Sequence, residues 1–489
     1  MQQNHTEILL QQTISPQLSV NLSKIRTIAE GSSDLLVNEF VLSGLPAALL
    51  CCESMLSTST MTELILKPIT AIRLECPTAA NVFAFIRNHQ LYSIDRAEAS
   101  TYADLFRFLN SGFAVLVLDG ADSALVFGIQ GYDKRSVSEP SGEDNVMGAK
   151  DGFIEVVRVN MSLLRRRMKT PQLKLELFVK GSKSQTDLCL CYMADRVPQS
   201  LIAQIKARLD EMELESILSS GYLQPFLENR RGCLFDTVGT TQRPDVLCAK
   251  LLEGRVGLLI DGTPFALVIP KLFCESFQTM DDYCYRPAYA TLVRWIKYAA
   301  FLVAVLLPAL YVAIALHHPE LLNRTLLLIL ADAEENAPIS LTAEAIGVLL
   351  VYEIIREAGL RLPKAVGGAV SIVAGLIIGD AAVASGLIST PMLTVTAIAV
   401  IAGFVVPDLA QSITLLRLAF LLIAGFWGLF GISLLGAAVL FNLCAGESFG
   451  FPITAPIAPL YKKGFRDTLT RVSFRKMQSG SFTVEEYHE

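Results

Sequence analysis

The chain has 489 residues, of which 52% are hydrophobic and 18% are charged, and its formal net charge at pH 7 is −6. Its mean hydropathy of +0.46 is higher than soluble proteins normally show. The acidic balance provides no broad basic field for a phosphate backbone, so we expect no nucleic acid partner. Only 15 of the 160 residues from 301 to 460 are charged, and we therefore expect membrane lipid to solvate that stretch.

The sequence carries no pattern typical of an enzyme or a metal site. It contains no Gly-x-Ser-x-Gly, His-Glu-x-x-His or Walker loop. The ten cysteines include no Cys-x-x-Cys pair, so we expect reduced, partly buried thiols. We assign no catalytic residue, no cofactor and no metal. The first thirty residues lack a signal peptide, which favours a cytoplasmic N-terminal part.

Two segments of the N-terminal part align without gaps, residues 112–126 and residues 254–268. In each, two short aliphatic runs flank an Asp-Gly pair, which begins at Asp119 or Asp261 and is typical of a β-hairpin. We interpret these two carboxylates as turn residues in preference to an acid/base pair. A second pair of strand-like segments begins at Ala47 and Asp187, and each leads into a helical stretch.

These repeats predict a multi-domain fold of the α+β/α class, with two related α/β cytoplasmic subdomains followed by a polytopic α-helical membrane domain. A run rich in Gly, Ser and Asp separates the subdomains and has the chemistry of a linker. The predicted parts are residues 1–135 for the first subdomain, 136–152 for the linker, 153–290 for the second subdomain, 291–460 for the membrane domain and 461–489 for a basic cytoplasmic tail.

Residues 153–168 have apolar positions at helical spacing and end in three consecutive arginines, Arg165, Arg166 and Arg167. Cations near a helix C-terminus complement the helix dipole. We therefore favour a solvated helix end over an anion-binding site for these arginines.

Residues 298–316 form a nineteen-residue apolar run that is long enough to cross a bilayer core of about 30 Å. Pro308 interrupts this run and is a candidate helix bend, tolerated in lipid when a neighbouring helix supplies a donor to the freed carbonyl. Further candidate spans are residues 339–360, 365–387, 392–406 and 415–444, and the last is long enough for one extended helix or a tight pair. Basic residues near Arg361 and in the tail belong inside, which predicts an even number of crossings, four to six.

Carboxylates interrupt the apolar pattern of residues 339–360. Glu353 and Glu357 lie four residues apart on one helical face, with Arg356 and Arg361 beside them. Carboxylates at membrane depth usually face a bundle interior, a water-filled path or a partner, which indicates an ion pathway. The equally weighted alternative is an amphipathic helix at the membrane interface. Glu353, Arg356, Glu357 and Arg361 are our candidate pore or interface charges.

Between about residue 115 and residue 460 the chain resembles the A subunits of the GerA-type spore germination receptors. The resemblance is carried by residues 134–140, 151–155, 160, 164–167, 219–222, 242–245, 253–256, 261–265, 306–312, 318–320, 353–363, 371–375 and 456–460. It implies a multi-pass subunit in the inner spore membrane that acts with a transporter-like B subunit and a lipoprotein C subunit. It also implies a homo-oligomer that relays nutrient binding into ion release or forms the ion channel.

Two other functions are compatible with parts of the sequence. The segment Gly148-Ala-Lys-Asp-Gly-Phe153 resembles the stage V sporulation protein AF branch of the same superfamily, which implies an accessory germination channel subunit. Several spans with carboxylates would also suit a stand-alone secondary transporter, although the membrane half shows no inverted repeat.

Overall fold

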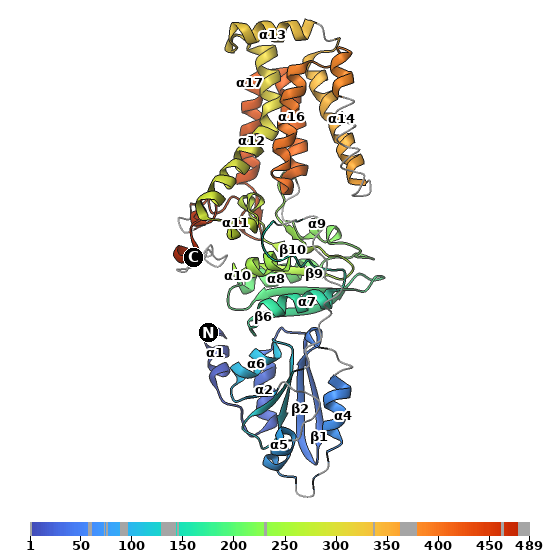
Figure 1. The fold of residues 1–489 in the computed structure, drawn as a ribbon, viewed down its shortest axis with the longest axis vertical. Coiled ribbons are helices and arrows are strands. Elements are labelled where there is room, and N and C mark those ends of the chain that lie inside the picture. Colours follow the sequence, from blue (N-terminus) through green and yellow to red (C-terminus); the bar gives the residue numbers. More distant parts are fainter. Residues whose placement is uncertain are drawn as a thin grey trace.

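The computed structural model describes residues 2–56, 61–72, 74, 77–88, 96–128, 143, 146–228, 232–335, 338–361, 379–460 and 464–477. Two β-sheet domains and a helical bundle follow one another along the longest axis of the molecule (Figure 1). Most of the predicted linker 136–152, most of the candidate span 365–387 and the end of the tail lie outside the described residues.

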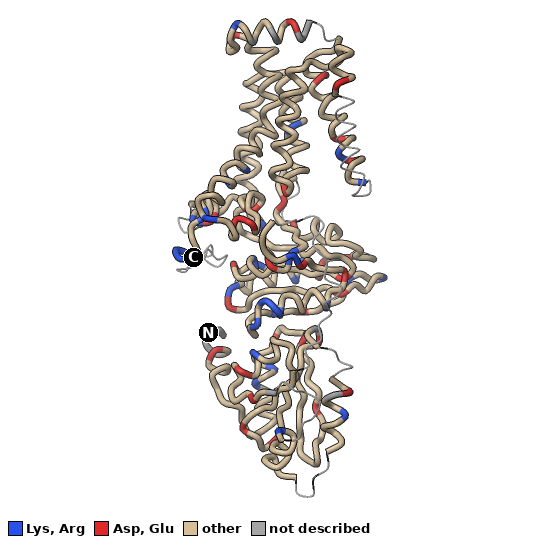
Figure 2. Tube along the Cα trace, viewed as in Figure 1, with Lys and Arg blue, Asp and Glu red and all other residues tan. Residues whose placement is uncertain are grey.

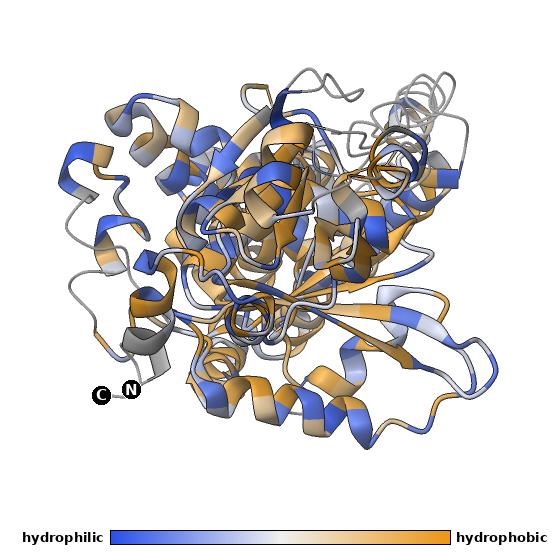
Figure 3. Cartoon of the chain, turned by 90° about the horizontal axis from the view of Figure 1, so that it is seen from below, coloured by the Kyte–Doolittle hydropathy of each residue, from blue (hydrophilic) through white to orange (hydrophobic). Residues whose placement is uncertain are grey.

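The first domain is an antiparallel sheet covered on both faces by helices. Its strands are β1 (Leu35–Leu42), β2 (Leu45–Cys52), β3 (Arg96–Ala99), β4 (Phe113–Leu118) and β5 (Ala124–Gly128), in the order β1-β2-β4-β5-β3. One face packs against α1 (Gln2–Gln11), α2 (Leu18–Ile28) and α6 (Tyr102–Leu109), and the other against α4 (Lys67–Thr70) and α5 (Ala79–Asn88). Because both faces are covered, the central strand β4 is apolar along its whole length. Viewed from below, hydrophilic and hydrophobic residues alternate along the helices that surround the sheets (Figure 3).

The second domain repeats this architecture. Its strands are β6 (Leu173–Lys180), β7 (Thr186–Met193), β8 (Gly239–Thr241), β9 (Val256–Ile260) and β10 (Ala266–Ile269), in the order β6-β7-β9-β10-β8. One face packs against α7 (Val157–Arg167) and α10 (Pro244–Leu252), and the other against α8 (Gln199–Asp210) and α9 (Gln224–Leu227). Counted within each domain, the strand order is the same, and the two predicted hairpins are confirmed as β4–β5 and β9–β10.

The duplication extends to individual hydrogen bonds. The Asp119 carboxylate accepts the Leu18 N–H at 2.7 Å, and the Asp261 carboxylate accepts the Val157 N–H at 3.0 Å. Each aspartate therefore satisfies a free donor at the start of a helix as well as forming a turn. Ala47 of β2 pairs with Leu118, and Leu188 of β7 pairs with Ile260, so the repeat aligns Ala47 with Leu188 and not with Asp187.

A buried ion pair joins the two sheet domains. Arg165 of α7 donates from Nε to Asp34 at 2.8 Å, and their side chains are 2% and 1% exposed. Lys174 donates to the Ile28 carbonyl at 2.8 Å, and burial lowers the pKa of Lys174 to about 8. The prediction of a solvated helix end is therefore wrong for Arg165, because the first domain packs on that face of α7.

The helical bundle contains α12 (Pro287–His317), α13 (Arg324–Glu335), α14 (Leu341–Arg361), α16 (Thr390–Phe404) and α17 (Ala410–Cys444). Helix α13 lies across the end of the bundle that is remote from the sheet domains (Figure 1). Residues Pro287–His317 and Pro407–Cys444 are long and apolar enough to cross a membrane, by length and composition. The four to six crossings expected from the sequence therefore stay a prediction.

Helix α17 turns back on itself at Gly428, whose φ of 58° and ψ of −143° are not helical. Ser412 and Asn442, on opposite sides of that glycine, both bond to the loop that carries Leu234 near the sheet domain. Gly428 itself lies at the far end of α12, where a Cβ would come within 2.9 Å of the Cβ of His317. The structure therefore selects the tight pair, with halves of about 27 and 24 Å.

Short elements complete the chain. They are η1 (Glu53–Met55), η2 (Thr62–Leu66), η3 (Ser220–Tyr222), η4 (Phe273–Phe277), α11 (Asp281–Cys284), η5 (Pro319–Leu321), η6 (Pro407–Leu409), β11 (Glu447–Ser448), β12 (Phe451–Pro452), η7 (Gly464–Arg466) and α18 (Phe474–Met477). Among them, η4 and α11 lie between the second sheet domain and the base of α12.

Candidate functional site in the helical bundle

The predicted charges of α14 divide into two separate pairs. Arg356 forms an ion pair with Glu353 at 2.6 Å, and Thr414 of α17 donates to Glu353 at 3.1 Å. Arg356 also reaches the Thr414 hydroxyl at 3.4 Å. These three side chains bridge α14 and α17, and the side chains of Arg356 and Glu353 are 32% and 19% exposed, so the pair Glu353–Arg356 faces a neighbouring helix at the edge of the bundle.

Glu357 and Arg361 do not join this group. They pair with each other at 2.6 Å, and their side chains are 56% and 79% exposed. Figure 2 shows that the bundle carries few charges and that several of them lie along α14. An exposed pair of this kind contributes little to the stability of the chain. Because both side chains are exposed, another molecule could contact them.

Pro308 creates the main polar feature of the bundle interior. A proline has no N–H, so the carbonyl four residues earlier in α12, that of Ala304, loses its helical donor. Arg417 of α17 supplies the missing donor, with its Nε 2.8 Å from the Ala304 oxygen. The candidate helix bend therefore coincides with a hydrogen bond between α12 and α17, the arrangement that makes an intramembrane proline tolerable.

Arg417 is deeply buried, with a relative exposure of 4%. The structure places Gly403 of α16 directly beside it, since a Cβ at Gly403 would lie 3.2 Å from Nη2 of Arg417. Tyr352, Glu353 and Arg356 are all within electrostatic reach of this guanidinium. Four helices therefore meet at one polar level of the bundle.

Sequence reasoning missed Arg417, although a signal was present. It is the only charged residue among residues 409–446, and charged residues inside apolar helices are usually functional. Its partner is a backbone carbonyl, however, and the pairing of positions 304 and 417 depends on how α12 and α17 pack.

A second buried carboxylate, Glu344, organises the other end of α14. Its Oε1 accepts the backbone N–H of Ser389 at 2.6 Å and the Ser389 hydroxyl at 2.8 Å. Ser389 in turn caps the N-terminus of α16. Glu344 thus fixes the start of α16 and has a structural explanation.

The second sheet domain is joined to the base of the bundle by a buried charge network. Arg255, which directly precedes β9, and Lys250 of α10 both pair with Glu275 of η4, the lysine at 3.1 Å. Burial alone would raise the pKa of Glu275, but the two cations beside it lower that pKa to about 2. η4 is therefore held rigidly to the sheet domain.

The same junction continues into α12. Phe277 of η4 stacks on Tyr298 with ring centroids 4.1 Å apart. Arg294 of α12 is fully buried and pairs with Asp282 at 2.8 Å and with Asp467 of the tail at 3.0 Å. Helix α12 begins at Pro287, eleven residues before the predicted apolar run, and Arg294 in this added part is neutralised by the two aspartates.

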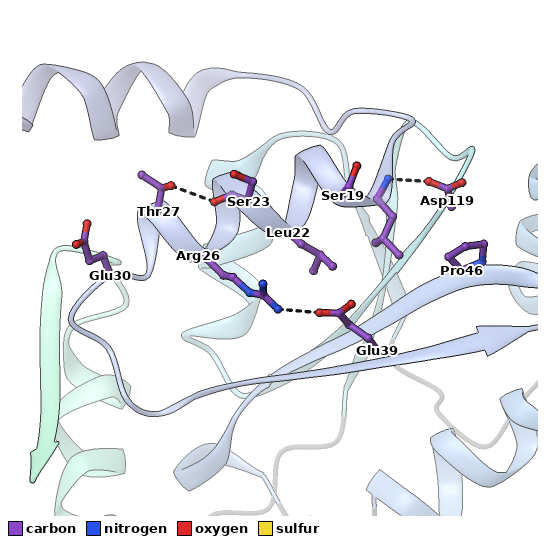
Figure 4. A pocket seen from close by; sticks show the side chains of 10 residues that line it. Ser19, Leu22, Ser23, Arg26, Thr27, Glu30, Glu39, Pro46 and Asp119 are labelled. Carbon is purple, nitrogen blue, oxygen red and sulfur yellow. Dashed lines mark hydrogen bonds and ion pairs between the residues drawn. The ribbon is translucent and has the colours of Figure 1, made fainter.

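An open groove lies between α2 and β1 of the first domain (Figure 4). It encloses about 820 Å³, and Arg26 pairs across it with Glu39 at 2.7 Å. In the duplication Arg26 corresponds to Arg165, which the second domain buries against Asp34. The groove is therefore the uncovered counterpart of the interface between the two domains. Among the described residues, no group of three or more His, Cys, Asp or Glu side chains is placed to hold a metal ion.

Comparison with known proteins identifies the family. The family model described as Bacillus/Clostridium GerA spore germination protein matches residues 23–481. The chain is 35% identical to spore germination protein KA of Bacillus subtilis, over 94% of this chain and 85% of that protein. It is 34% identical to the uncharacterized membrane protein YfkQ of the same organism, over 95% and 90%, and 32% identical to spore germination protein GerLA of Bacillus cereus, over 76% of each.

Among solved structures, the chain is similar to the N-terminal domain of the A subunit of the Bacillus megaterium spore germinant receptor GerK3. The identity is 27%, the match covers 54% of this chain and 98% of that domain, and the TM-score is 0.42. Since the family model spans nearly the whole chain and relatives of 30% identity or more are matched along most of their length, the chain belongs to the GerA family of spore germination proteins.

Proposed function

We propose that this chain is the membrane subunit of a spore germination receptor complex. In this proposal it oligomerises and either relays nutrient binding into ion release or forms the ion channel. It resides in the inner spore membrane with its sheet domains in the spore core, and it acts with a transporter-like B subunit and a lipoprotein C subunit. Family membership and the similarity to spore germination proteins support this assignment.

The observation that carries the proposal is a continuous buried connection from the sheet domains to the bundle interior. Glu275 is tied to the second sheet domain by Arg255 and Lys250, and the neighbouring Phe277 packs on α12. Ala304, a little over half-way along the same helix from its base to the far end, bonds to Arg417. In this proposal a displacement of the second sheet domain moves α12, and with it the Ala304 carbonyl that Arg417 contacts.

The candidate charges have distinct roles in this proposal. Glu353 and Arg356, which bridge α14 and α17, line or close the ion path. Glu357 and Arg361 are exposed and meet a neighbouring subunit. Pro308 bends α12 and gives Arg417 its acceptor.

The geometry of the helices supports an even number of crossings. The start of α12 and both ends of α17 lie next to the second sheet domain, and the turn at Gly428 lies at the far end. The described part of the tail returns to the base of α12 through Asp467. The chain thus enters and leaves the bundle from the same end, as a tail and sheet domains on one side of a membrane require.

Spores that carry Glu353→Gln or Glu357→Gln test the proposal. We expect altered ion release after germinant addition with unchanged assembly of the complex, because each substitution removes a charge without removing volume. Glu215→Gln is the matched control, since Glu215 is an exposed acid of the second sheet domain that pairs with Lys183. Release identical to wild type in both test variants would refute the assigned roles.

The accessory role remains the second candidate, because residues 148–153 resemble the stage V sporulation protein AF branch. Affinity purification of the chain from spore membranes separates the two. A transporter-like subunit and a lipoprotein in the purified complex would support the receptor, and a homo-oligomer without them would support the accessory channel subunit. A lone monomer would point to a stand-alone transporter.

A further inference from the structure

The bundle interior holds more positive than negative charge. At the level of Ala304 there are two guanidinium groups, Arg356 and Arg417, and one carboxylate, Glu353. That carboxylate is already engaged by Arg356 and by the Thr414 hydroxyl. One full positive charge is therefore left without a counter-ion in an apolar environment.

Arg417 is the group that carries this charge. Among the described residues no carboxylate lies within ion-pair distance of it, and its Nη1 has no hydrogen-bond acceptor. A hydrogen bond to the Ala304 carbonyl satisfies one donor but does not neutralise the charge. Burying an unpaired charge costs several kcal/mol, so proteins pair such groups or bind an ion to them.

The acids of α14 are already engaged by other groups. Within residues 345–379 the only acidic residues are Glu353 and Glu357, and both are paired within α14. Glu344 is bound to Ser389 at the opposite end of α14. No described carboxylate of this chain therefore forms an ion pair with Arg417.

We propose that Arg417 and Arg356 form a binding site for a small monovalent anion, of which chloride and formate are representatives. Arginine suits such a ligand because its planar guanidinium directs several donors toward one anion. Gly403 leaves the space beside Nη2 of Arg417 free of a side chain. Helix α16, which carries this glycine, forms the remaining wall of the site.

Burial decides between a free anion and a lipid headgroup. Arg417 is 4% exposed and is surrounded by α12, α14, α16 and α17, so a phosphate attached to a lipid cannot reach it from the bundle surface. A small free anion carries no lipid tail that holds it at the bundle surface.

The role of this site in ion release rests on the proposed function, whereas anion binding itself does not. If the complex conducts or senses ions, this level of the bundle repels cations and attracts anions. The class of ion that acts at Arg417 is then an anion.

The test is thermal unfolding of the purified full-length chain in detergent while chloride replaces gluconate at constant sodium concentration. Gluconate is much larger than chloride, and because both anions are monovalent the two salts screen surface charges to a similar extent. A ligand that binds only the folded state stabilises it progressively as its concentration exceeds the dissociation constant. We expect a saturable rise of the unfolding temperature with chloride in the wild type and loss of that rise in Arg417→Gln.

Three further variants keep the result interpretable. Arg356→Gln should weaken the apparent chloride affinity at least about tenfold, since it removes the second cation. Gly403→Ala keeps every charge but places a methyl group 3.2 Å from Nη2, so it should also weaken binding, and it tests the site should Arg417→Gln fail to fold. Arg361→Gln removes an exposed arginine and should leave the chloride response unchanged.

The outcomes are separable from those of the proposed function. Equal unfolding temperatures in chloride and gluconate, or an equal chloride response in wild type, Arg417→Gln and Gly403→Ala, would overturn the anion site. Absence of ion release from reconstituted complexes would overturn the channel role and leave a saturable chloride response in the isolated chain intact.

Discussion

The bond between Ala304 and Arg417 exists because residue 308 is a proline, and this dependence can be measured. In the wild type the Ala304 carbonyl has no helical donor and accepts Nε of Arg417 at 2.8 Å. With Pro308→Ala, a backbone N–H at position 308 becomes available to the same carbonyl. The Ala304 carbonyl then no longer needs the hydrogen bond from Arg417. The loss of unfolding free energy on replacing Arg417 should therefore depend on which residue stands at position 308.

The magnitude follows from the kind of hydrogen bond. A bond from a charged donor contributes about 1.5–3 kcal/mol, and a buried carbonyl left without any donor costs about 1–3 kcal/mol. Arg417→Met should therefore be more harmful by about 1.5–3 kcal/mol in the Pro308 background than in the Pro308→Ala background. The cost of burying the guanidinium is common to both backgrounds and cancels in the double-mutant cycle.

The assay is equilibrium unfolding of the full-length chain in mixed micelles with increasing denaturing detergent, for the wild type, both single variants and the double variant. A matched cycle combines Pro308→Ala with Arg361→Met, where Arg361 is exposed and far from the proline along the chain, and should be additive within about 0.5 kcal/mol. Additivity in the Arg417 cycle as well would show that the proline and the arginine act independently, and the reasoning would be wrong.

Three further changes have defined outcomes. Asp34→Asn leaves the Arg165 charge buried and unpaired between the sheet domains, so the free energy of unfolding should fall by about 3–5 kcal/mol in chemical denaturation. The pKa of Glu275 is lowered from 4.5 to about 2, which corresponds to a stabilisation of about 3 kcal/mol. This stabilisation is present above pH 4.5 and is lost as the pH falls toward 2. Glu275→Gln should therefore remove this acid dependence from unfolding curves recorded between pH 5 and 2. Gly428→Ala combines a positive φ with a Cβ 2.9 Å from His317, and should lower the unfolding temperature of the chain.

Each of these predictions has a control and a contradicting result. Glu39→Gln disrupts an ion pair that is more than half exposed and should change the free energy of unfolding by no more than about 1 kcal/mol. If Asp34→Asn lowered the free energy of unfolding by no more than Glu39→Gln does, burial of the Arg165–Asp34 pair would have no effect on its contribution. Wild-type acid unfolding of Glu275→Gln would contradict the lowered pKa of this carboxyl. Gly436→Ala lies in the same helix with nothing near its added Cβ, and should be neutral where Gly428→Ala is not.

Much of the soluble fold follows from local pattern. The Asp-Gly pairs at Asp119 and Asp261 identify two hairpins because each pair needs a glycine at positive φ, and Gly120 and Gly262 have φ of 85° and 86°. The ungapped match around them identifies the duplication. What pattern could not show is that one copy covers the other, because the burial of Arg165 and the exposure of Arg26 depend on docking of whole domains.

The candidate site was only half accessible to sequence reasoning. Helical spacing places Glu353 and Arg356 one turn apart and Glu357 and Arg361 one turn apart, and both pairs form. Spacing also suggested that Glu353 and Glu357 share a face, but only Glu353 meets a neighbouring helix. The difference arises because α17 packs against one side of α14, and no periodicity within α14 contains that information.

The sequence by itself determined the apolar third of the chain, the duplicated sheets, the proline in the first apolar helix and the family to which the chain belongs. Each of these depends on residues that are near one another along the chain or on matches along its whole length. Only the tertiary structure decided that α17 reverses at Gly428, that Arg165 is buried and that Arg417 serves the carbonyl freed by Pro308. These contacts join positions more than a hundred residues apart or depend on a single backbone torsion, and their energies come from burial that exists only once the helices and domains have packed.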